Sequence, residues 1–303
     1  MTKLSLKDLD VSGRRVLTRV DYNVPLDEKG EISDDRRIRA SLPTVDWVIQ
    51  RGGRAVLMSH LGRPKGKPVG TMSLKPAAER LKHLLGREVG FSTDCIGKEA
   101  EGLVSSMKDG DVILLENLRF HAEEEENDQK FAQALSRLGE LYVNDAFGTA
   151  HRAHASTAGV TRYFDKCAAG FLMEKEIEFL GKALESPVRP FAAILGGAKI
   201  SGKIELIKNL LDKVDKLLIG GGMAFTFLRA QRLQVGASLV EEDKLELAKE
   251  TLREAAKKDL TLLLPIDCVV AQESRDGAPS RIVGKNEIPE GWKGLDIGPL
   301  TVR

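Results

Sequence analysis

Cysteine is scarce in this chain of 303 residues, which contains three cysteines, Cys95, Cys167 and Cys268. They lie far apart, are odd in number and form no Cys-x-x-Cys pair, so their spacing indicates neither a disulfide framework nor a zinc site. We expect three reduced thiols that are buried in the protein core.

Long apolar runs and an excess of charge of one sign are also lacking. No apolar run approaches the length that spans a bilayer, and the N-terminal segment MTKLSLKD lacks the apolar centre of a signal peptide. The 46 Lys and Arg residues balance 45 Asp and Glu residues, and the net charge of +1 gives no general attraction to nucleic acid. We therefore expect a cytoplasmic protein with no membrane or nucleic-acid partner, in which any cationic site is local.

What the chain has is an alternation of short β-branched runs with amphipathic helical stretches. This pattern is typical of parallel sheets built from βαβ units, and 303 residues suffice for two domains with separate cores. The strands expected in the first half are residues 15–20, 55–59, 88–92, 112–116 and 141–144, and the helices are residues 38–50, 74–85 and 128–138. The second series has expected strands at residues 191–195, 216–219 and 262–270, and helices at residues 203–214 and 241–258. An apolar helix over residues 171–184 is expected to join the two domains.

Cationic and imidazole side chains follow three of the expected strands. Residues 60–64 (HLGRP) come directly after one strand, Arg119 follows a second, and Arg152 lies between two histidines after a third. Because ligands of open α/β sheets bind at the carboxyl ends of strands, these segments predict one phosphate site assembled from distant parts of the chain. Gly62 permits close backbone approach and Arg63 offers a planar fork of donors, so binding is favoured over a structural turn.

The roles of three other polar residues stay open on this evidence. Asp21 and Asn23 follow the first strand, where they fit ligand binding and a local turn equally well. Arg37 belongs to the charged run 34–38 (DDRRI), which fits a solvated helix start better than a site.

Several charged groups are assigned no chemistry. The acidic run over residues 123–126 is interpreted as a solvated helix start or loop. His83 and His121 are interpreted as ordinary surface or packing residues without a partner.

The second half contains a near match to a P-loop at residues 197–204 (GAKISGKI). This segment follows an expected strand, opens a helix and fits the first seven positions of the motif. Ile204 breaks the match, because an aliphatic side chain cannot replace the hydroxyl that binds magnesium. What remains is a pair of glycines with Lys199 and Lys203 at a helix N-terminus, which favours phosphate binding. The glycine run at residues 220–222 adds a second loop that allows close approach.

Six stretches together closely resemble the phosphoglycerate kinase family, and the resemblance covers essentially the whole chain. They are residues 19–25 (RVDYNVP), 59–64 (SHLGRP), 115–120 (LENLRF), 144–152 (NDAFGTAHR), 195–199 (LGGAK) and 220–225 (GGGMAF). The resemblance implies an α/β fold of two doubly wound parallel-sheet (Rossmann-like) domains joined by a hinge helix. Residues 1–172 would bind 3-phosphoglycerate, and residues 173–303 would form the hinge helix and part of a nucleotide domain. The second domain is expected to be incomplete because the family continues past residue 303, which bears on nucleotide affinity, turnover and stability.

The resemblance also implies a reaction of glycolysis, in which 1,3-bisphosphoglycerate and ADP give 3-phosphoglycerate and ATP. The residues implied for the acid substrate are Asp21, Asn23, Arg37, His60, Leu61, Gly62, Arg63, Arg119 and Arg152. Those implied for the nucleotide are Gly197, Ala198, Lys199, Lys203, Gly221, Gly222 and Gly294. Arg37 and Lys199 would compensate the charge of the transferred phosphoryl group. The resemblance therefore makes Arg37 a candidate site residue, although its spacing alone did not. Mg²⁺ would arrive with ATP or ADP, and no protein residue is assigned as a metal ligand.

Further expectations follow from the same resemblance. Gly202 departs from the Asp often found at this position in the family, which leaves the immediate partner of Lys203 open. The chain is expected to be a monomer in which closure of a hinge at residues 171–187 brings both substrates together and expels water. Two other functions stay open: a phosphoglycerate-binding module without turnover, and a P-loop NTPase that hydrolyses ATP without an acceptor acid, which Ile204 makes less favoured.

Overall fold

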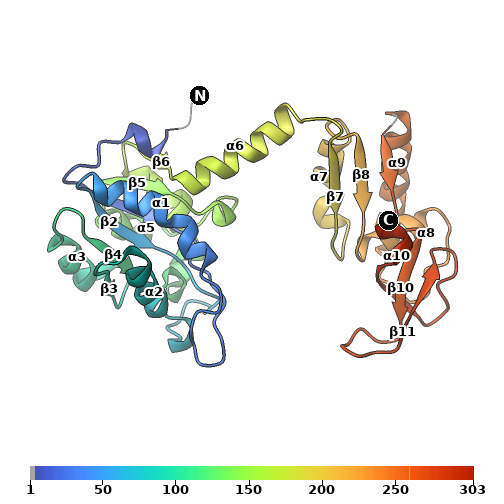
Figure 1. Ribbon diagram of the computed structural model, residues 1–303, viewed down its shortest axis with the longest axis horizontal. Helices are drawn as coiled ribbons and strands as arrows, with labels where there is room; N and C mark the ends of the chain where they lie inside the picture. The colour runs from blue at the N-terminus through green and yellow to red at the C-terminus, as the bar shows by residue number, and fades with distance from the viewer. Residues whose placement is uncertain (1–3, 259) are drawn as a thin grey trace. The chain divides into compact units, whose positions relative to one another are not determined.

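The structure of the protein is a computed structural model that describes residues 4–258 and 260–303. The chain divides into two compact units, and the division falls between Leu180 and Gly181, within helix α6 (Phe171–Glu185) (Figure 1). We call the part up to Leu180 unit 1 and the part from Gly181 unit 2. The expected helix over residues 171–184 is confirmed, and the domain boundary at residues 172 and 173 stays a prediction.

Unit 1 is built on a six-stranded parallel sheet. In spatial order its strands are β3 (Gly90–Ser92), β4 (Val112–Leu115), β2 (Arg54–Met58), β1 (Arg15–Arg19), β5 (Leu141–Asn144) and β6 (Cys167–Ala169). The direction of winding reverses at β1, because β2 pairs with one of its edges and β5 with the other. In doubly wound sheets such a reversal marks the ligand-binding crevice at the carboxyl ends of the strands.

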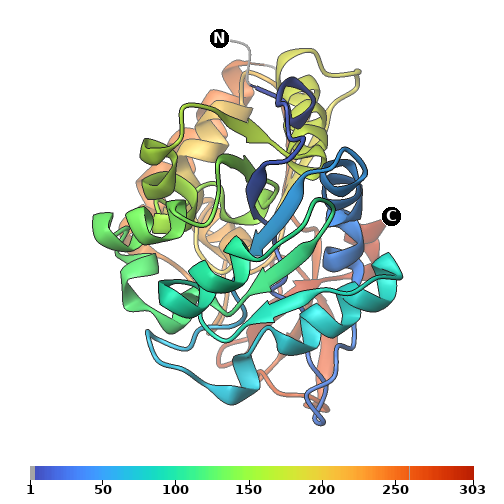
Figure 2. The ribbon, with the colours of Figure 1, turned by 90° about the vertical axis from the view of Figure 1, so that its left-hand side faces the viewer.

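Helices cover both faces of this sheet (Figure 2). Side chains alternate along a strand, so Val16 and Leu57 face a core shared with α1 (Arg36–Gln50) and α2 (Lys75–Leu85). Leu17 and Val56 face the opposite core, which contains side chains of α3 (Gly97–Ser105) and α5 (Gln129–Ser136). The remaining short elements of the unit are η1 (Leu6–Asp8), η2 (Gly70–Met72), η3 (Leu118–Phe120), α4 (Ala122–Glu125), η4 (Phe147–Thr149), η5 (Ala155–Gly159) and η6 (Val160–Tyr163).

Local chemistry sets the ends of several helices. Helix α2 carries a proline in its first turn and ends at Gly86, whose φ of 63° is the left-handed conformation that favours glycine. The Asp128 side chain caps α5 by accepting a hydrogen bond from the Phe131 amide. Asp145, which follows β5, accepts the amides of Leu172 and Met173 at 2.9 and 3.1 Å and so holds the start of α6.

Unit 2 contains two three-stranded sheets. The parallel sheet has the order β7 (Ala192–Leu195), β8 (Lys216–Ile219), β9 (Thr261–Leu263). The antiparallel sheet has the order β11 (Ser280–Gly284), β10 (Asp267–Ala271), β12 (Lys293–Ile297). The helices are η7 (Ser201–Lys203), α7 (Ile204–Leu210), α8 (Met223–Ala230), η8 (Glu242–Lys244), α9 (Leu245–Lys257) and α10 (Pro299–Val302).

The parallel sheet of unit 2 buries one face. Leu217 and Ile219 point into a core with α7, α8 and α9. On the other face Ile194 is 77% exposed and lines an apolar pocket of about 420 Å³, together with residues such as Leu218 and Leu263.

Most expected elements are found, with shifted ends, but two elements and one thiol differ from expectation. A single strand over residues 262–270 is wrong: the chain forms β9, leaves the parallel sheet at Leu264-Pro265-Ile266 and enters the antiparallel sheet as β10. The helix expected over residues 203–214 is shorter and starts with the 3₁₀ turn η7. The thiols of Cys95 and Cys268 are buried and free as expected, whereas Cys167 is half-buried.

Candidate functional site

Arg19, at the carboxyl end of β1, lies at the base of a cationic cluster in unit 1. Its guanidinium is buried, donates from Nε to Ser156 Oγ at 2.9 Å, and lies with Nη2 at 3.1 Å from His60 Nδ1. Burial lowers the pKa of Arg19 from its usual value, although nearby Glu124 opposes this shift. Because a guanidinium only donates, His60 Nδ1 must accept, and a neutral His60 then carries its proton on Nε2.

His60 is held in the neutral form. Burial, with Arg19, Arg119, Arg152 and His154 nearby, lowers its pKa to about 2. At physiological pH the imidazole therefore offers a neutral Nε2–H donor among cations.

Gly62 connects the loop after β2 to two other predicted residues. Its amide donates to Asn23 Oδ1 and its carbonyl accepts from Arg119 Nη1, both at 2.9 Å. Its φ is 63°, and a Cβ atom there would lie 2.9 Å from the Met72 sulfur, so a glycine is required. Leu61 is buried, and its carbonyl accepts from the Asn117 side chain at 2.8 Å.

Arg119 and Arg152 come from different loops and act on the same groups. The Arg119 side chain is 4% exposed, lies 3.2 Å from Glu125, and has a pKa lowered first by burial and also by Arg152. Arg152 is half-buried, and it also lowers the pKa of His60. The two arginines therefore converge near His60, as the strand ends predicted.

Arg37 lies at the edge of this cluster. It donates to Asp21 Oδ2 at 2.8 Å, and its side chain is 51% exposed. The other Asp21 oxygen accepts the amide of Asn23, whose side chain binds Gly62. Arg37 and Asp21 line a pocket of about 360 Å³ with Phe147 and Gly148.

Arg63 differs from the other predicted arginines. Its side chain is exposed, and among the residues that the structure describes it forms no hydrogen bond or ion pair. It is nevertheless held near the cluster by its chain neighbour Gly62, which binds Arg119.

The sequence pattern gave no sign of a role for Glu124, and the interpretation of Glu124 as a solvated residue is wrong. It is fully buried and accepts hydrogen bonds from the Ser156 amide at 2.9 Å and from Ser156 Oγ at 2.5 Å. It lies 3.8 Å from His154 Nδ1 and acts electrostatically on Arg19. One carboxylate beneath several cations limits their mutual repulsion, and no pattern in an all-acidic run distinguishes it from its exposed neighbours Glu123, Glu125 and Glu126.

His121 also has a hydrogen-bonding partner, which was not expected from the sequence. Its Nε2 lies 2.7 Å from Asp94 Oδ1. The expectation that His121 stands alone is therefore wrong.

In unit 2 the loops after β7 and β8 approach one another closely. Gly197 (φ 151°) and Gly221 (φ 65°) both have positive φ, and a Cβ on Gly221 would lie 2.9 Å from the Gly197 nitrogen. A Cβ on Gly222 would lie 3.2 Å from the carbonyl oxygen of Ala198. The Gly197 carbonyl accepts the Met223 amide at the start of α8, which fixes this loop.

The two predicted lysines lie beside these glycines. Lys199 is exposed, and the stem of Lys203 passes Gly197, where a Cβ would lie 3.0 Å from Lys203 Cε. Glu241, which was expected to open a helix, instead accepts the amides of Ile200 and Ser201 and stabilises the loop. Ammonium groups and a glycine loop with positive φ match the oxygens of a phosphate chain.

Gly294 is a packing position of unit 2. It lies on β12, where an added Cβ would overlap the ring of Phe225. The need for glycine is explained by this packing, and a role along the nucleotide stays a prediction.

Comparison with known proteins gives consistent matches over the whole chain. A family model described as phosphoglycerate kinase matches residues 6–303. The phosphoglycerate kinase of Synechococcus elongatus is 57% identical over 302 residues, which are 100% of this chain and 75% of that protein. The phosphoglycerate kinase of Chlorobium limicola is 58% identical over 301 residues, which are 99% of this chain and 76% of that protein.

Solved structures agree. The structure of phosphoglycerate kinase from Coxiella burnetii has a TM-score of 0.82 at 40% identity and covers 99% of this chain and 75% of its own. That from Pyrococcus horikoshii OT3 has a TM-score of 0.82 at 30% identity and covers 98% of this chain and 76% of its own. The chain thus spans about three quarters of the length of the relatives it matches. Within its described residues, no helix is both long and apolar enough to cross a membrane.

Proposed function

Since the chain belongs to the phosphoglycerate kinase family, we propose that it catalyses reversible phosphoryl transfer between 1,3-bisphosphoglycerate and ADP, giving 3-phosphoglycerate and ATP. The single observation that carries this proposal for the chain's own residues is the cluster at the carboxyl ends of β1 and β2. There Arg19, Arg119 and Arg152 surround a neutral His60.

The cluster suits a small acid that carries both a phosphate and a carboxylate. Arginine binds both groups through paired N–H donors, and the half-buried setting strengthens each charge-assisted hydrogen bond relative to water. We propose that Asp21, Asn23, His60, Arg63, Arg119 and Arg152 bind the acid substrate. Leu61 and Gly62 hold the loop that presents these groups, because the backbone of Gly62 links Asn23 to Arg119.

Arg37 and Lys199 are proposed to act on the transferred phosphoryl group. A β-phosphate oxygen of ADP forms a bond to phosphorus while the bond from phosphorus to the acyl oxygen breaks, and the carboxylate leaves with its electron pair. No side chain has to form a covalent bond, so catalysis depends on in-line positioning and on cations that compensate the moving charge. Arg37 is accessible for this role, because half of its side chain surface is exposed.

The nucleotide is proposed to enter with its Mg²⁺ ion as a substrate complex. Lys199 and Lys203 supply positive charge, and the close-packed loops of Gly197, Ala198, Gly221 and Gly222 allow a phosphate chain to approach the backbone. Gly294 is kept as a predicted nucleotide contact. Magnesium would neutralise phosphate charge, and the chain's own residues would orient the phosphate oxygens.

The test is a coupled assay of ATP formation by the purified chain, beside the Arg37→Ala variant and the matched control Arg36→Ala. We expect Arg37→Ala to lower kcat by about 10³-fold, the lower end of what a transition-state arginine contributes in phosphoryl transfer. Arg36 also lies at this pocket but pairs with Asp34, and its removal should change kcat by less than about threefold.

Each outcome of the assay has a distinct meaning. ATP formation that depends on Arg37 supports the proposal. Calorimetric binding of 3-phosphoglycerate with no turnover at any ADP concentration would leave a binding module, and ATP hydrolysis without an acceptor acid would favour an NTPase. We propose that the protein is a cytoplasmic monomer. Size-exclusion chromatography with light scattering tests whether it is monomeric.

A further inference from the structure

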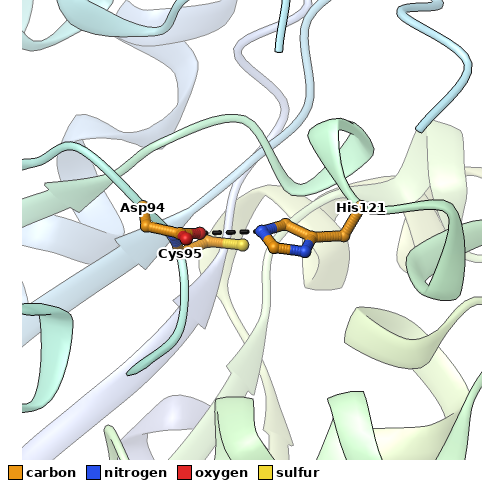
Figure 3. A group of neighbouring side chains, drawn as sticks. All are labelled: Asp94, Cys95 and His121. Carbon is orange, nitrogen blue, oxygen red and sulfur yellow. Dashed lines mark hydrogen bonds and ion pairs between the residues drawn. The ribbon is translucent and has the colours of Figure 1, made fainter. Parts of the chain in front are cut away.

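Asp94, Cys95 and His121 lie together in unit 1 (Figure 3). Asp94 and Cys95 occupy the loop between β3 and α3, and His121 follows η3. The carboxylate, thiol and imidazole ligand atoms all lie within 4.8 Å of one another, and Figure 3 shows the sulfur beside both the carboxylate and the ring. The phosphoryl-transfer proposal uses none of these three side chains.

The three atoms are a sulfur, a nitrogen and an oxygen, which is a ligand set typical of zinc. Zinc binds such ligands at about 2.0–2.3 Å in a tetrahedron, so ligand atoms around one ion lie about 3.3–3.8 Å apart. The ligand atoms of these three side chains lie within 4.8 Å of one another, which is close to that spacing. The harder ions Mg²⁺ and Ca²⁺ prefer oxygen ligands and do not match a thiol.

The setting of Cys95 does not suit a reactive thiol. The residue is fully buried, and burial, with the carboxylates of Asp94 and Glu124, raises the pKa of its thiol well above the usual value.

Two of the three side chains are accessible from solvent. The side chains of Asp94 and His121 are 46% and 27% exposed. His121 also lines a pocket of about 360 Å³ with Ile96 and Phe131. Solvent can therefore supply a water molecule as a fourth ligand.

We propose that Asp94, Cys95 and His121 bind one Zn²⁺ ion, with water in the fourth position. The ion replaces the direct contact between His121 and Asp94 and joins the loop after β3 to the segment that carries Arg119 and Glu124. Zinc binding therefore stabilises unit 1 close to its cationic cluster, and the thiol proton is released to solvent.

The experiment titrates the purified chain with zinc chloride against a chromogenic chelator and records the absorption spectrum with cobalt(II) chloride. We expect one ion per chain and a sulfur-to-cobalt charge-transfer band. Cys95→Ala should abolish the band and weaken zinc binding by at least about a hundredfold, the upper range for lost outer-shell partners of a metal site. His121→Gln should weaken zinc binding while leaving Cys95 in place.

Two matched variants serve as controls. Cys167→Ala removes a half-buried thiol of the same unit, and His83→Gln removes an exposed histidine outside the cluster, so both should bind zinc as the parent chain does. Thermal unfolding confirms that each variant is folded, and zinc but not magnesium should raise the midpoint for the parent chain. The proposal is overturned if binding is below one ion per chain, or if the control variants lose as much affinity as Cys95→Ala and His121→Gln.

Discussion

The two parallel sheets of this protein are covered differently. In unit 1 helices pack on both faces, so that Leu17 and Val56 on one face and Val16 on the other are fully buried. In unit 2 the helices α7, α8 and α9 pack on one face of the parallel sheet, and Ile194 on the other face is 77% exposed. Parallel sheets are normally covered on both faces, so unit 2 derives less hydrophobic stabilisation per strand than unit 1.

The candidate sites of the two units also differ in how far their cationic side chains are buried. In unit 1, Arg19 and Arg119 are held by buried or partly buried hydrogen bonds, Arg19 to Ser156 and Arg119 to Gly62. In unit 2 Lys199 is exposed, and the loops are shaped mainly by backbone contacts between glycines. The cluster of unit 1 is therefore a preorganised side-chain network, whereas the loops of unit 2 combine backbone shape with exposed charge.

The largest difference should appear in core truncations. Ile113→Ala, on β4 in unit 1, removes a side chain that is 4% exposed and should lower the free energy of unfolding of this unit by about 2–5 kcal/mol. The matched change Ile194→Ala in unit 2 should alter it by no more than about 0.5 kcal/mol. In a Trp292→Phe background, the fluorescence of Trp47 reports the urea unfolding of unit 1. In a Trp47→Phe background, the fluorescence of Trp292 reports that of unit 2. Similar losses from both changes would contradict the difference in burial.

The buried network of unit 1 should depend on Glu124. Glu124→Ala leaves buried cations uncompensated and the Ser156 donors unpaired, so we expect the free energy of unfolding to fall by about 3 kcal/mol. Glu123→Ala, one residue earlier and exposed, should change it by less than about 0.5 kcal/mol. The same Trp47 fluorescence measurement checks both, and equal effects would show that Glu124 has no special role.

In unit 2 the charge of Lys203 should affect ligand binding more than stability. Lys203→Met should weaken ADP binding by about ten- to hundredfold, since a hydrogen bond to a charged group contributes about 1.5–3 kcal/mol. Lys208→Met, on the exposed surface of α7, is the control and should leave the Kd for ADP unchanged. Calorimetry in the presence of Mg²⁺ measures both, and an unchanged Kd for Lys203→Met would remove this lysine from the nucleotide site.

The smallest expected effect is the net pH dependence of stability in unit 1, because two buried groups act in opposite directions. The pKa of His60 falls to about 2 on folding, so between about pH 4 and 6 the unfolded chain binds one more proton there. Through His60 the free energy of unfolding therefore increases by about 1.4 kcal/mol for each unit of rising pH, and this stabilisation is lost as the pH falls. Burial raises the pKa of Asp145 to about 6, so in the same window the folded chain binds one more proton there and the slope is opposite.

Two variants separate these opposing slopes. His60→Gln should lower the slope of the free energy of unfolding between pH 4 and 6 by about 1.4 kcal/mol per pH unit relative to the parent chain. Asp145→Asn should raise it by a similar amount. If both variants run parallel to the parent chain, the two groups do not titrate as their surroundings indicate.

Much of the fold and of the candidate site could be predicted from the sequence. Short, mainly apolar runs such as β5 and β8 match their expected bounds, because a run of this length is too short for a typical helix and fits a buried strand of a parallel sheet. The strand ends carrying His60, Arg119 and Arg152 were correctly predicted to converge, since parallel strands bring their carboxyl ends to one edge.

Other features could not be predicted, because they depend on contacts between distant segments. Residues 262–270 were expected to form one strand, yet the segments on either side of Pro265 pair with different sheets. Glu124 and His121 have partners 32 and 27 residues away, and their chain neighbours give no sign of them. Arg37 was recognised through resemblance to a family rather than through its spacing.

The sequence by itself determined the alternation of strands and helices, the family and the set of cationic residues near the strand ends, because these follow from local periodicity and motif. The tertiary structure decided which carboxylate is buried beneath the cations, which nitrogen of His60 accepts a hydrogen bond, and which thiol meets a histidine. These depend on how closely separate loops approach, and hydrogen bonds and electrostatic interactions are set by distances of a few ångströms that no local pattern encodes.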